Sequence, residues 1–362
     1  MNEREQGVTT LELFFDLVFV FTITQLTSVL AHGGLGEGLL HGAILLVIVF
    51  WMYGGYAWLT NLVRTDTLER RLIMLASMAA WLVLALAIPH AFGDDSVAFG
   101  LAYLVIVLVH SGLFLLNAGP GGRQVMLRIA PGNVGFALAI IAGGAIGGDA
   151  QVVIWAVSAT AVWLSGALAG VGAVEVAADH FVERHGLIVI VTIGESIVAV
   201  GIGAGGLPLD IELVGVAVLG VLLSACLWWT YFGGEDVRAL EAMRSADPEQ
   251  RGRWALYAFG YCHLPLLLGI VAVAAGLEVA IAHPFDALDT APAVFLAAGA
   301  AVYLLGSVAF RAVLRIGGAL PRALVAVVLL ATVPVGTEGS ALAQLALLVA
   351  LFSLSFLRTA RP

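Results

Sequence analysis

Residues 39–60 read LLHGAILLVIVFWMYGGYAWLT, a stretch that contains no Asp, Glu, Lys or Arg. A membrane-spanning helix needs about 20 mostly apolar residues, and this stretch has that length and composition. Similar stretches recur along the whole chain, which is 61% hydrophobic and 11% charged. A soluble domain cannot bury that much apolar surface. The sequence therefore predicts an all-α, polytopic membrane protein whose solvent is the lipid bilayer.

About twelve transmembrane helices are expected, because stretches of spanning length follow one another closely. The weakest is 132–148, which is short, rich in glycine and preceded by Pro131. A broken or re-entrant segment is the alternative there, provided that it lines a cavity. The predicted spans are 11–31, 39–60, 71–92, 97–117, 132–148, 150–172, 186–205, 211–233, 254–279, 290–312, 319–336 and 340–357.

All sixteen basic side chains are arginines, and they occupy only the tails and alternate gaps between the spans. Short cytoplasmic loops accumulate arginine because its translocation is costly. The pattern predicts that both termini are cytoplasmic and that the number of crossings is even. The arginines fall into seven groups: Arg4; Arg64, Arg70, Arg71; Arg123, Arg128; Arg184; Arg238, Arg244, Arg251, Arg253; Arg311, Arg315, Arg322; Arg358, Arg361.

Charge and cysteine content exclude other classes of protein. The net charge of −9 argues against a nucleic-acid partner, because no basic patch is available to neutralise phosphates. Cys226 and Cys262 lie within predicted spans and are expected to act as small apolar residues, not as a disulfide framework. The long, partly acidic segment 234–253 predicts a short solvated helix, with a second turn beginning at Pro248.

The two halves of the chain look related. Glu12 precedes Trp58 by nearly the same interval that separates Glu183 from Trp228, and both tryptophans close a predicted span. Six spans in each half preserve orientation, so the repeat would be parallel. The sequence thus predicts two parallel six-helix halves, 1–172 and 173–362, within one membrane unit.

Two carboxylates open the first span, in the run LELFFDLVFVF of residues 11–21. Glu12 and Asp16 are four positions apart and share one helical face. A carboxylate at lipid depth is costly and often marks an ion or proton route. Glu12 also fits an N-terminal helix carboxylate that the helix dipole favours. For Asp16, which lies one turn deeper among large apolar residues, both interpretations stay open.

Glu195 is the strongest single candidate, because it lies near the middle of the span 186–205. Thr192 lies one turn before it on the same face, and Ser196 is adjacent. A carboxylate at this depth is expected to be protonated, or held by an ion or by a partner on another helix. The alternative is a protonated Glu195 that donates to a backbone carbonyl at a helix contact.

A charged cluster precedes this span and contains Asp179, His180, Glu183 and Arg184, with Glu175 on the same helical face. Carboxylates and imidazole together are typical of some metal sites. The alternative is a cytoplasmic helix extension that side-chain pairs stabilise. The sequence leaves the metal and any cofactor unassigned.

The ninth span contains Tyr261, His263 and Pro265. Proline frees a backbone carbonyl and kinks a helix. A histidine beside a kink is a plausible proton carrier, while the alternative is a packed polar residue at a helix contact. We add Gln25, which lies in the apolar run of the first span, to the candidate pathway.

Several of these segments resemble the bacterial low temperature requirement A (LtrA) family. They are 11–21, 180–187 leading into 194–196, 228–232 and 261–265, so the resemblance covers almost the whole chain. The segment 61–66 matches the family pattern only in part. Residues 14–16 are also faintly similar to the Phe-Ser-Asp motif of a lysosomal and bacterial potassium-channel family. The resemblance implies a bacterial multi-pass protein of the inner (cytoplasmic) membrane and names no substrate.

The sequence favours a transporter or channel for a small solute, proton or cation, with Asp16, Glu195 and His263 in the pathway. One alternative is a membrane-embedded enzyme acting on a lipid or other apolar substrate near residues 175–185. Another is a membrane sensor or scaffold. A homo-oligomer stays open.

Overall fold

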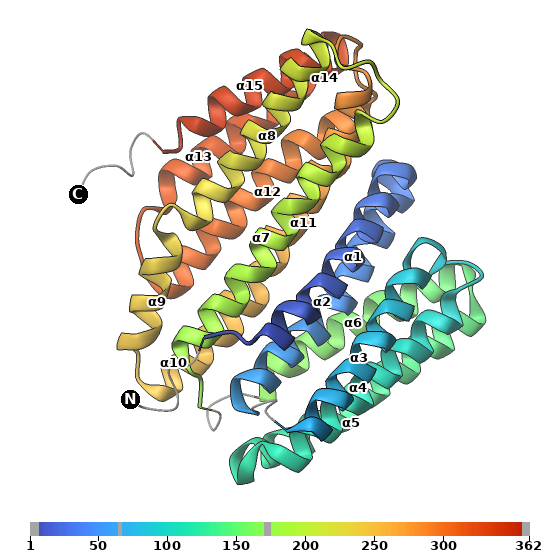
Figure 1. The fold of residues 1–362 in the computed structure, drawn as a ribbon, viewed down its shortest axis with the longest axis vertical. Helices are drawn as coiled ribbons and strands as arrows, with labels where there is room; N and C mark the ends of the chain where they lie inside the picture. The colour runs from blue at the N-terminus through green and yellow to red at the C-terminus, as the bar shows by residue number, and fades with distance from the viewer. Residues whose placement is uncertain (1–6, 64–66, 170–174, 357–362) are drawn as a thin grey trace. The chain divides into compact units, whose positions relative to one another are not determined.

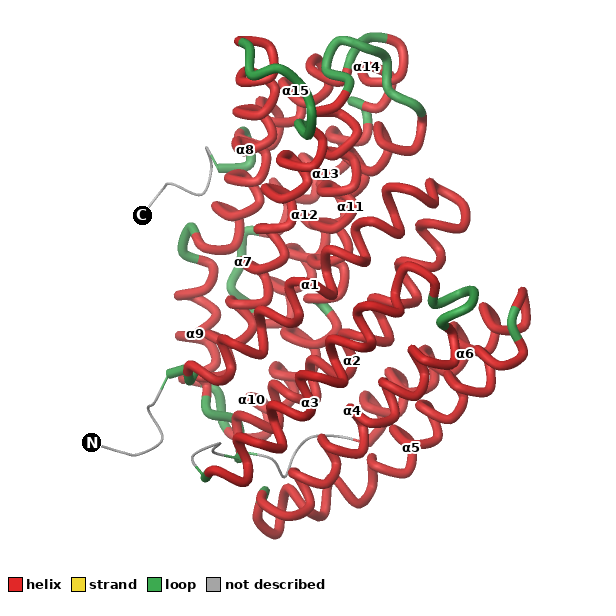
Figure 2. Tube along the Cα trace, turned by 45° about the vertical axis from the view of Figure 1, so that its right-hand side comes forward, coloured by secondary structure: helices red, strands yellow, loops and turns green. Residues whose placement is uncertain are grey.

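The computed structural model describes residues 7–63, 67–169 and 175–356. All regular structure in these ranges is helical, which confirms the all-α prediction (Figure 1; Figure 2). Four arginines of the alternating pattern (Arg4, Arg64, Arg358 and Arg361) lie outside these ranges. The helices are α1 Thr10–Gly33, η1 Gly34–Gly38, α2 Leu39–Leu62, α3 Leu68–Ala87, η2 Ile88–His90, α4 Ser96–Asn117, α5 Gly119–Ile146, α6 Gly148–Ala169, α7 Ala178–Gly203, α8 Ile211–Phe232, α9 Glu235–Ser245, α10 Pro248–Trp254, η3 Ala255–Tyr261, α11 His263–Ala282, α12 Thr290–Leu314, α13 Ala319–Leu330, α14 Val333–Glu338 and α15 Ala341–Ser353.

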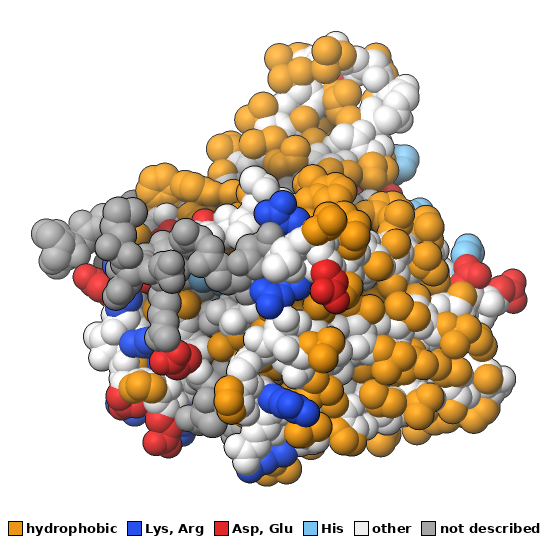
Figure 3. Space-filling model, turned by 60° about the horizontal axis from the view of Figure 1, so that its bottom comes forward, with side chains coloured by type: hydrophobic (Ala, Val, Ile, Leu, Met, Phe, Trp, Pro, Cys, Tyr) orange, Lys and Arg blue, Asp and Glu red, His pale blue; other side chains and the backbone are white. Residues whose placement is uncertain are grey.

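The helices have the length and composition of membrane spans. Within the described residues, 10 helical stretches are long and apolar enough to cross a membrane, and Ala341–Ser353 is a shorter apolar helix. Large apolar side chains are exposed on many of them, for example Leu116 (80%) and Ile211 (83%). Hydrophobic side chains cover much of the surface in the view of Figure 3. A soluble monomer rarely exposes apolar areas of this extent, so lipid is the solvent of these faces. The number of crossings and the side on which the termini lie stay predictions.

The chain forms two compact units that are interleaved in sequence. Unit 1 comprises Met1–Leu26, His41–Leu187 and Met243–Leu256, and unit 2 comprises Thr27–Leu40, Ile188–Ala242 and Tyr257–Pro362. Each unit is described by itself below. The predicted halves 1–172 and 173–362 are a different division of the chain and stay a prediction.

Unit 1 packs α3 on α4, α4 on α5 and α5 on α6. Its interior is aromatic: the ring of Phe15 lies 5.2 Å from that of Tyr56 and 5.7 Å from that of Trp81, centroid to centroid. The weakest predicted span is one continuous helix, because α5 runs through Pro131 without a break. A broken segment is therefore absent from the described residues of α5.

In unit 2, α11 packs extensively against α12. The two backbones approach where Gly269 faces Gly299, and a Cβ at Gly269 would lie 2.6 Å from the Gly299 carbonyl oxygen. Small residues allow such approaches between helices in membranes. The π-helix η3 precedes α11, so the helix is irregular just before Pro265. A second short helix does begin at Pro248, as predicted.

Candidate functional site

Two carboxylates of α1 pair with a histidine and an arginine of α7 inside unit 1. Glu12 Oε1 lies 2.8 Å from His180 Nε2, and Asp16 Oδ2 lies 2.8 Å from Arg184 Nη1. The two carboxylates lie four positions apart on α1, and their two partners lie four positions apart on α7, so both bonds form along one line of contact. All four side chains are buried. We call these four residues the α1–α7 clasp.

Further contacts surround the buried Asp16–Arg184 pair in the inner half of the clasp. Arg184 Nη1 also donates to the Glu12 carbonyl oxygen over 3.0 Å. The Tyr53 hydroxyl donates to Asp16 Oδ1 over 3.3 Å. The Arg184 guanidinium carbon lies 5.5 Å from the centroid of the Phe15 ring and 5.6 Å from that of Tyr53, within cation–π range. A buried ion pair survives only when such additional bonds satisfy it.

The outer half of the clasp also caps a helix. Glu12 Oε2 accepts from the Thr9 N–H and from the Thr9 hydroxyl, both over 2.8 Å, and the Glu12 N–H faces Thr9 Oγ1 at 3.3 Å. This is a capping box, which satisfies free N–H groups at the helix start. Because an ionised carboxylate only accepts, Nε2 of His180 carries the hydrogen of the Glu12 bond. Glu12 thus serves both as the helix-start carboxylate and as the partner of His180.

The remaining members of the predicted cytoplasmic cluster tie α7 to other segments. Asp179 forms an ion pair with Arg244, and these two side chains are 41% and 60% exposed. Glu183 Oε2 accepts from the Val8 N–H over 3.1 Å. The part of the chain that the structure describes contains no group of three or more His, Cys, Asp or Glu side chains that could hold a metal ion. The cluster therefore acts as a set of pairwise contacts.

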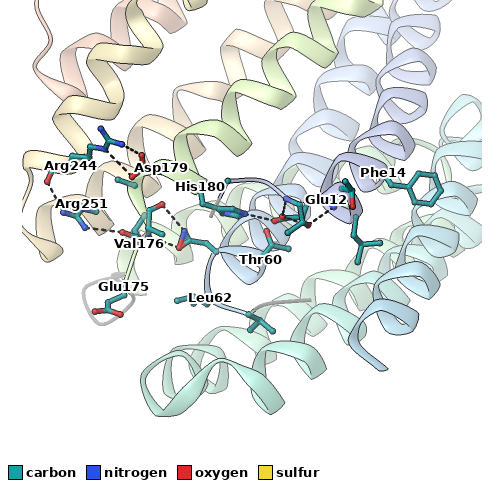
Figure 4. A pocket seen from close by; sticks show the side chains of 18 of the residues that line it. Glu12, Phe14, Thr60, Leu62, Glu175, Val176, Asp179, His180, Arg244 and Arg251 are labelled. Carbon is teal, nitrogen blue, oxygen red and sulfur yellow. Dashed lines mark hydrogen bonds and ion pairs between the residues drawn. The ribbon is translucent and has the colours of Figure 1, made fainter. Parts of the chain in front are cut away.

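A pocket of about 1000 Å³ opens beside the clasp in unit 1 (Figure 4). It lies where α1, α7 and α10 begin and α2 ends, and Figure 4 shows His180 directed at Glu12 along its wall. Arginines from two separate predicted gaps line this pocket, Arg71 from one and Arg244 and Arg251 from the other. The charged lining residues are Glu12, Arg71, Glu175, Asp179, His180, Arg244 and Arg251.

Glu195, Thr192 and Ser196 are all buried in the part of α7 that belongs to unit 2. The Thr192 hydroxyl donates to the Ile188 carbonyl of its own helix over 2.7 Å. Glu195 is 1% exposed, and its depth in the membrane stays a prediction. Asp16 belongs to unit 1, so a single pathway through Asp16 and Glu195 stays a prediction.

His263 uses both ring nitrogens in unit 2. Nδ1 lies 2.9 Å from the Ala258 carbonyl oxygen, and Nε2 lies 3.1 Å from the Tyr231 hydroxyl. Because a carbonyl only accepts, Nδ1 carries a hydrogen, and the neutral ring accepts from Tyr231. This arrangement suits a packed polar residue at a helix contact, and the relay role of His263 stays a prediction. Tyr261 and Gln25 are half-buried.

Sequence reasoning missed a second buried charge cluster, in unit 2. Glu235 was expected to be solvated, yet it is 1% exposed. Its Oε2 lies 3.3 Å from Arg311 Nη1 and also bonds Arg322, which in turn contacts the Ser307 hydroxyl. The sequence around Glu235 mixes acids and bases and does not single out this residue. The two arginines that contact it, Arg311 and Arg322, are far away in the sequence.

Comparisons with known proteins agree with this description. Residues 7–356 match the family described as bacterial low temperature requirement A protein (LtrA). The chain is 29% identical over 292 residues to an uncharacterized protein, RA0937, of Rhizobium meliloti (strain 1021), covering 76% of this chain and 70% of that protein. No solved structure matches the chain. The match extends over nearly all the described helices, and the chain belongs to the bacterial low temperature requirement A (LtrA) family of membrane proteins.

Proposed function

We propose that this protein is a transporter or channel for a small solute or ion, and that buried carboxylates in its helices hold the moving charge. We further place it in the bacterial inner membrane, with the arginine-bearing gaps on the cytoplasmic side. The moving species would be a proton, a cation or a small polar solute.

One observation carries the proposal: α1 and α7 bury ionisable side chains within helices of membrane-spanning composition. Asp16 and Arg184 are each less than 5% exposed as side chains, and Tyr53 bonds both residues. Ionisable groups in such helices are costly and by default belong to substrate or proton pathways. The pocket beside Glu12 supports access from the end of unit 1. Glu195 adds another buried carboxylate within a helix of membrane-spanning composition.

Flux measurements on full-length protein in liposomes test the proposal. Wild-type protein should carry H⁺, K⁺ or Na⁺, or a polar solute, faster than protein-free liposomes do. We expect Glu195→Gln to lower that rate about tenfold or more, because the amide keeps the size of the side chain and loses its charge. Glu212→Gln is the matched control, since Glu212 is an exposed carboxylate in the first turn of α8.

A paired variant tests the role of the clasp, because removing both charges leaves no buried charge without its partner. The paired variant Asp16→Asn with Arg184→Gln removes both charges and keeps polar groups in place. If the pair serves transport, this variant folds and its flux falls. Correctly folded protein that moves none of these species, or wild-type flux in both Glu195→Gln and the paired variant, contradicts the proposal.

A further inference from the structure

Two buried polar atoms beside the pocket of unit 1 have no hydrogen-bond partner in the described structure. They are His180 Nδ1 and Thr60 Oγ1, and both residues line the pocket. His180 is 8% exposed. Buried polar atoms are nearly always paired, so an unpaired one indicates where water or a ligand binds. Because both residues line the same pocket, the two unpaired atoms restrict the kind of ligand that could bind there.

The two atoms favour a ligand that donates hydrogen bonds. Nε2 of His180 carries the hydrogen of the Glu12 bond, so in the neutral tautomer Nδ1 is an acceptor. The Thr60 hydroxyl also accepts. The Glu12 carboxylate lies behind His180, so a positive charge on the donor is stabilised. A primary ammonium group, with three N–H donors, meets these requirements.

The rest of the lining carries charges of both signs. Three carboxylates and three arginines line the pocket, so its formal charges nearly balance. Arg244 is paired with Asp179, and Arg251 donates to the carbonyl oxygens of Met243, Val176, Arg244 and Ala246. Balanced charges suit a zwitterion better than a polycation or a polyanion. Leu11, Phe14, Leu62 and Val63 supply an apolar side, on which Phe14 is 50% exposed.

We propose that this pocket binds a zwitterionic ligand whose primary ammonium group donates hydrogen bonds to His180 Nδ1 and Thr60 Oγ1. Solvent does not reach either atom in this structure, so neighbouring groups move aside on binding while His180 keeps its bond to Glu12. The pocket lies at helix ends, at the level where lipid head groups meet spanning helices. The same chemistry is present in an ethanolamine phospholipid and in soluble phosphoethanolamine. The inference goes beyond transport, since binding requires no flux.

Purified full-length protein in detergent tests the inference by native mass spectrometry and by ligand-induced thermal shift. The lipid probes are phosphatidylethanolamine and phosphatidylcholine with identical acyl chains. The soluble probes are phosphoethanolamine and phosphocholine. Methylation to choline keeps the positive charge and removes every N–H donor. We expect the ethanolamine member of at least one pair to bind about tenfold more tightly, the effect of a hydrogen bond to a charged group. Preference confined to the lipid pair identifies a head group, and preference in the soluble pair identifies a solute.

Two variants link the preference to the two atoms. Thr60→Val removes the hydroxyl and keeps the branched shape. His180→Gln places an amide N–H toward Glu12 and lacks the second ring nitrogen. Thr160→Val is the matched control, because Thr160 is exposed on α6 and bonds only its own helix in the described structure. Each pocket variant should lose the ethanolamine preference, while the control keeps it. Equal binding of choline and ethanolamine probes by wild-type protein, as in a pocket filled by water alone, overturns the inference. So does a preference that survives both pocket variants.

Discussion

Replacing Arg184 by methionine should destabilise unit 1 far more than the same change at Arg244. Each arginine forms an ion pair with an aspartate of the same unit, and the two pairs differ in burial. The side chains of Arg184 and Asp16 are 1% and 4% exposed, whereas those of Arg244 and Asp179 are 60% and 41% exposed. Breaking a buried pair costs about 3–5 kcal/mol, because the remaining charge stays buried alone. An exposed pair contributes about 0–1 kcal/mol.

The contacts of Arg184 show which interactions the variant loses. In Arg184→Met, Asp16 loses its cation at 2.8 Å and keeps the Tyr53 hydroxyl as a donor. The Glu12 carbonyl loses a donor at 3.0 Å, and the rings of Phe15 and Tyr53 lose the guanidinium above them. The double variant Asp16→Leu with Arg184→Met removes both charges and should recover most of the loss. The double-mutant cycle should therefore give a coupling of about 2–3 kcal/mol.

Unfolding by SDS in mixed micelles, followed by far-UV circular dichroism and tryptophan fluorescence, measures these differences. Arg244→Met serves as the control, since it removes an equal charge from a pair that solvent reaches. We expect the order wild type, Arg244→Met, double variant, Arg184→Met, from most to least stable. If Arg184→Met unfolds at the SDS concentration of Arg244→Met, Asp16 is not held ionised by Arg184 and the clasp is not what stabilises this contact.

Three other changes have defined outcomes. Thr9→Val should cost about 0.5–2 kcal/mol by the same SDS titration, because it removes one side of the capping box at the start of α1; an unchanged midpoint would argue against the cap. Glu235→Gln should cost about 3–5 kcal/mol, because it leaves two buried arginines without their carboxylate; limited proteolysis between α8 and α10 reports the loosening, and unchanged cleavage contradicts it. Gly269→Ala should lower the thermal midpoint, since its Cβ would meet backbone atoms of α12 at 2.6 Å, whereas Gly194→Ala, with open space at its Cβ, should not.

The helical fold was accessible from the sequence because lipid imposes a simple requirement. Every backbone N–H and C=O in the hydrocarbon must be satisfied within the segment, so long apolar stretches become helices. Each predicted span falls mostly on helix in the described residues, including 132–148, of which residues 132–146 belong to α5. The span 319–336 is less regular than predicted, since α13 ends at Leu330 and α14 begins at Val333. The apolar pattern of this stretch gives no indication of the break between the two helices.

The pairing within the site was not accessible in the same way. Glu12, Asp16, His180 and Arg184 were all singled out, but as two separate groups, and nothing in the sequence joined them. In water, an amphipathic stripe indicates which face of a helix packs inward. In lipid both faces are apolar, so that signal is weak and the neighbour of a helix stays unknown. The Thr9-x-x-Glu12 pattern was a readable signal for the capping box.

The need to neutralise buried charges supplies part of the information about which helices pack together. Three arginines are buried in the described residues, namely Arg184, Arg311 and Arg322, and each is hydrogen-bonded to a buried carboxylate. All three lie within helices and not in the intervening loops. A guanidinium cannot lose its proton in a protein, so one that enters a helix of a membrane protein requires an acid nearby. This condition couples Arg184 to an acid of the first span and the other two arginines to Glu235. The condition requires an acid beside each of these arginines, and the structure identifies Glu235 as the one beside Arg311 and Arg322.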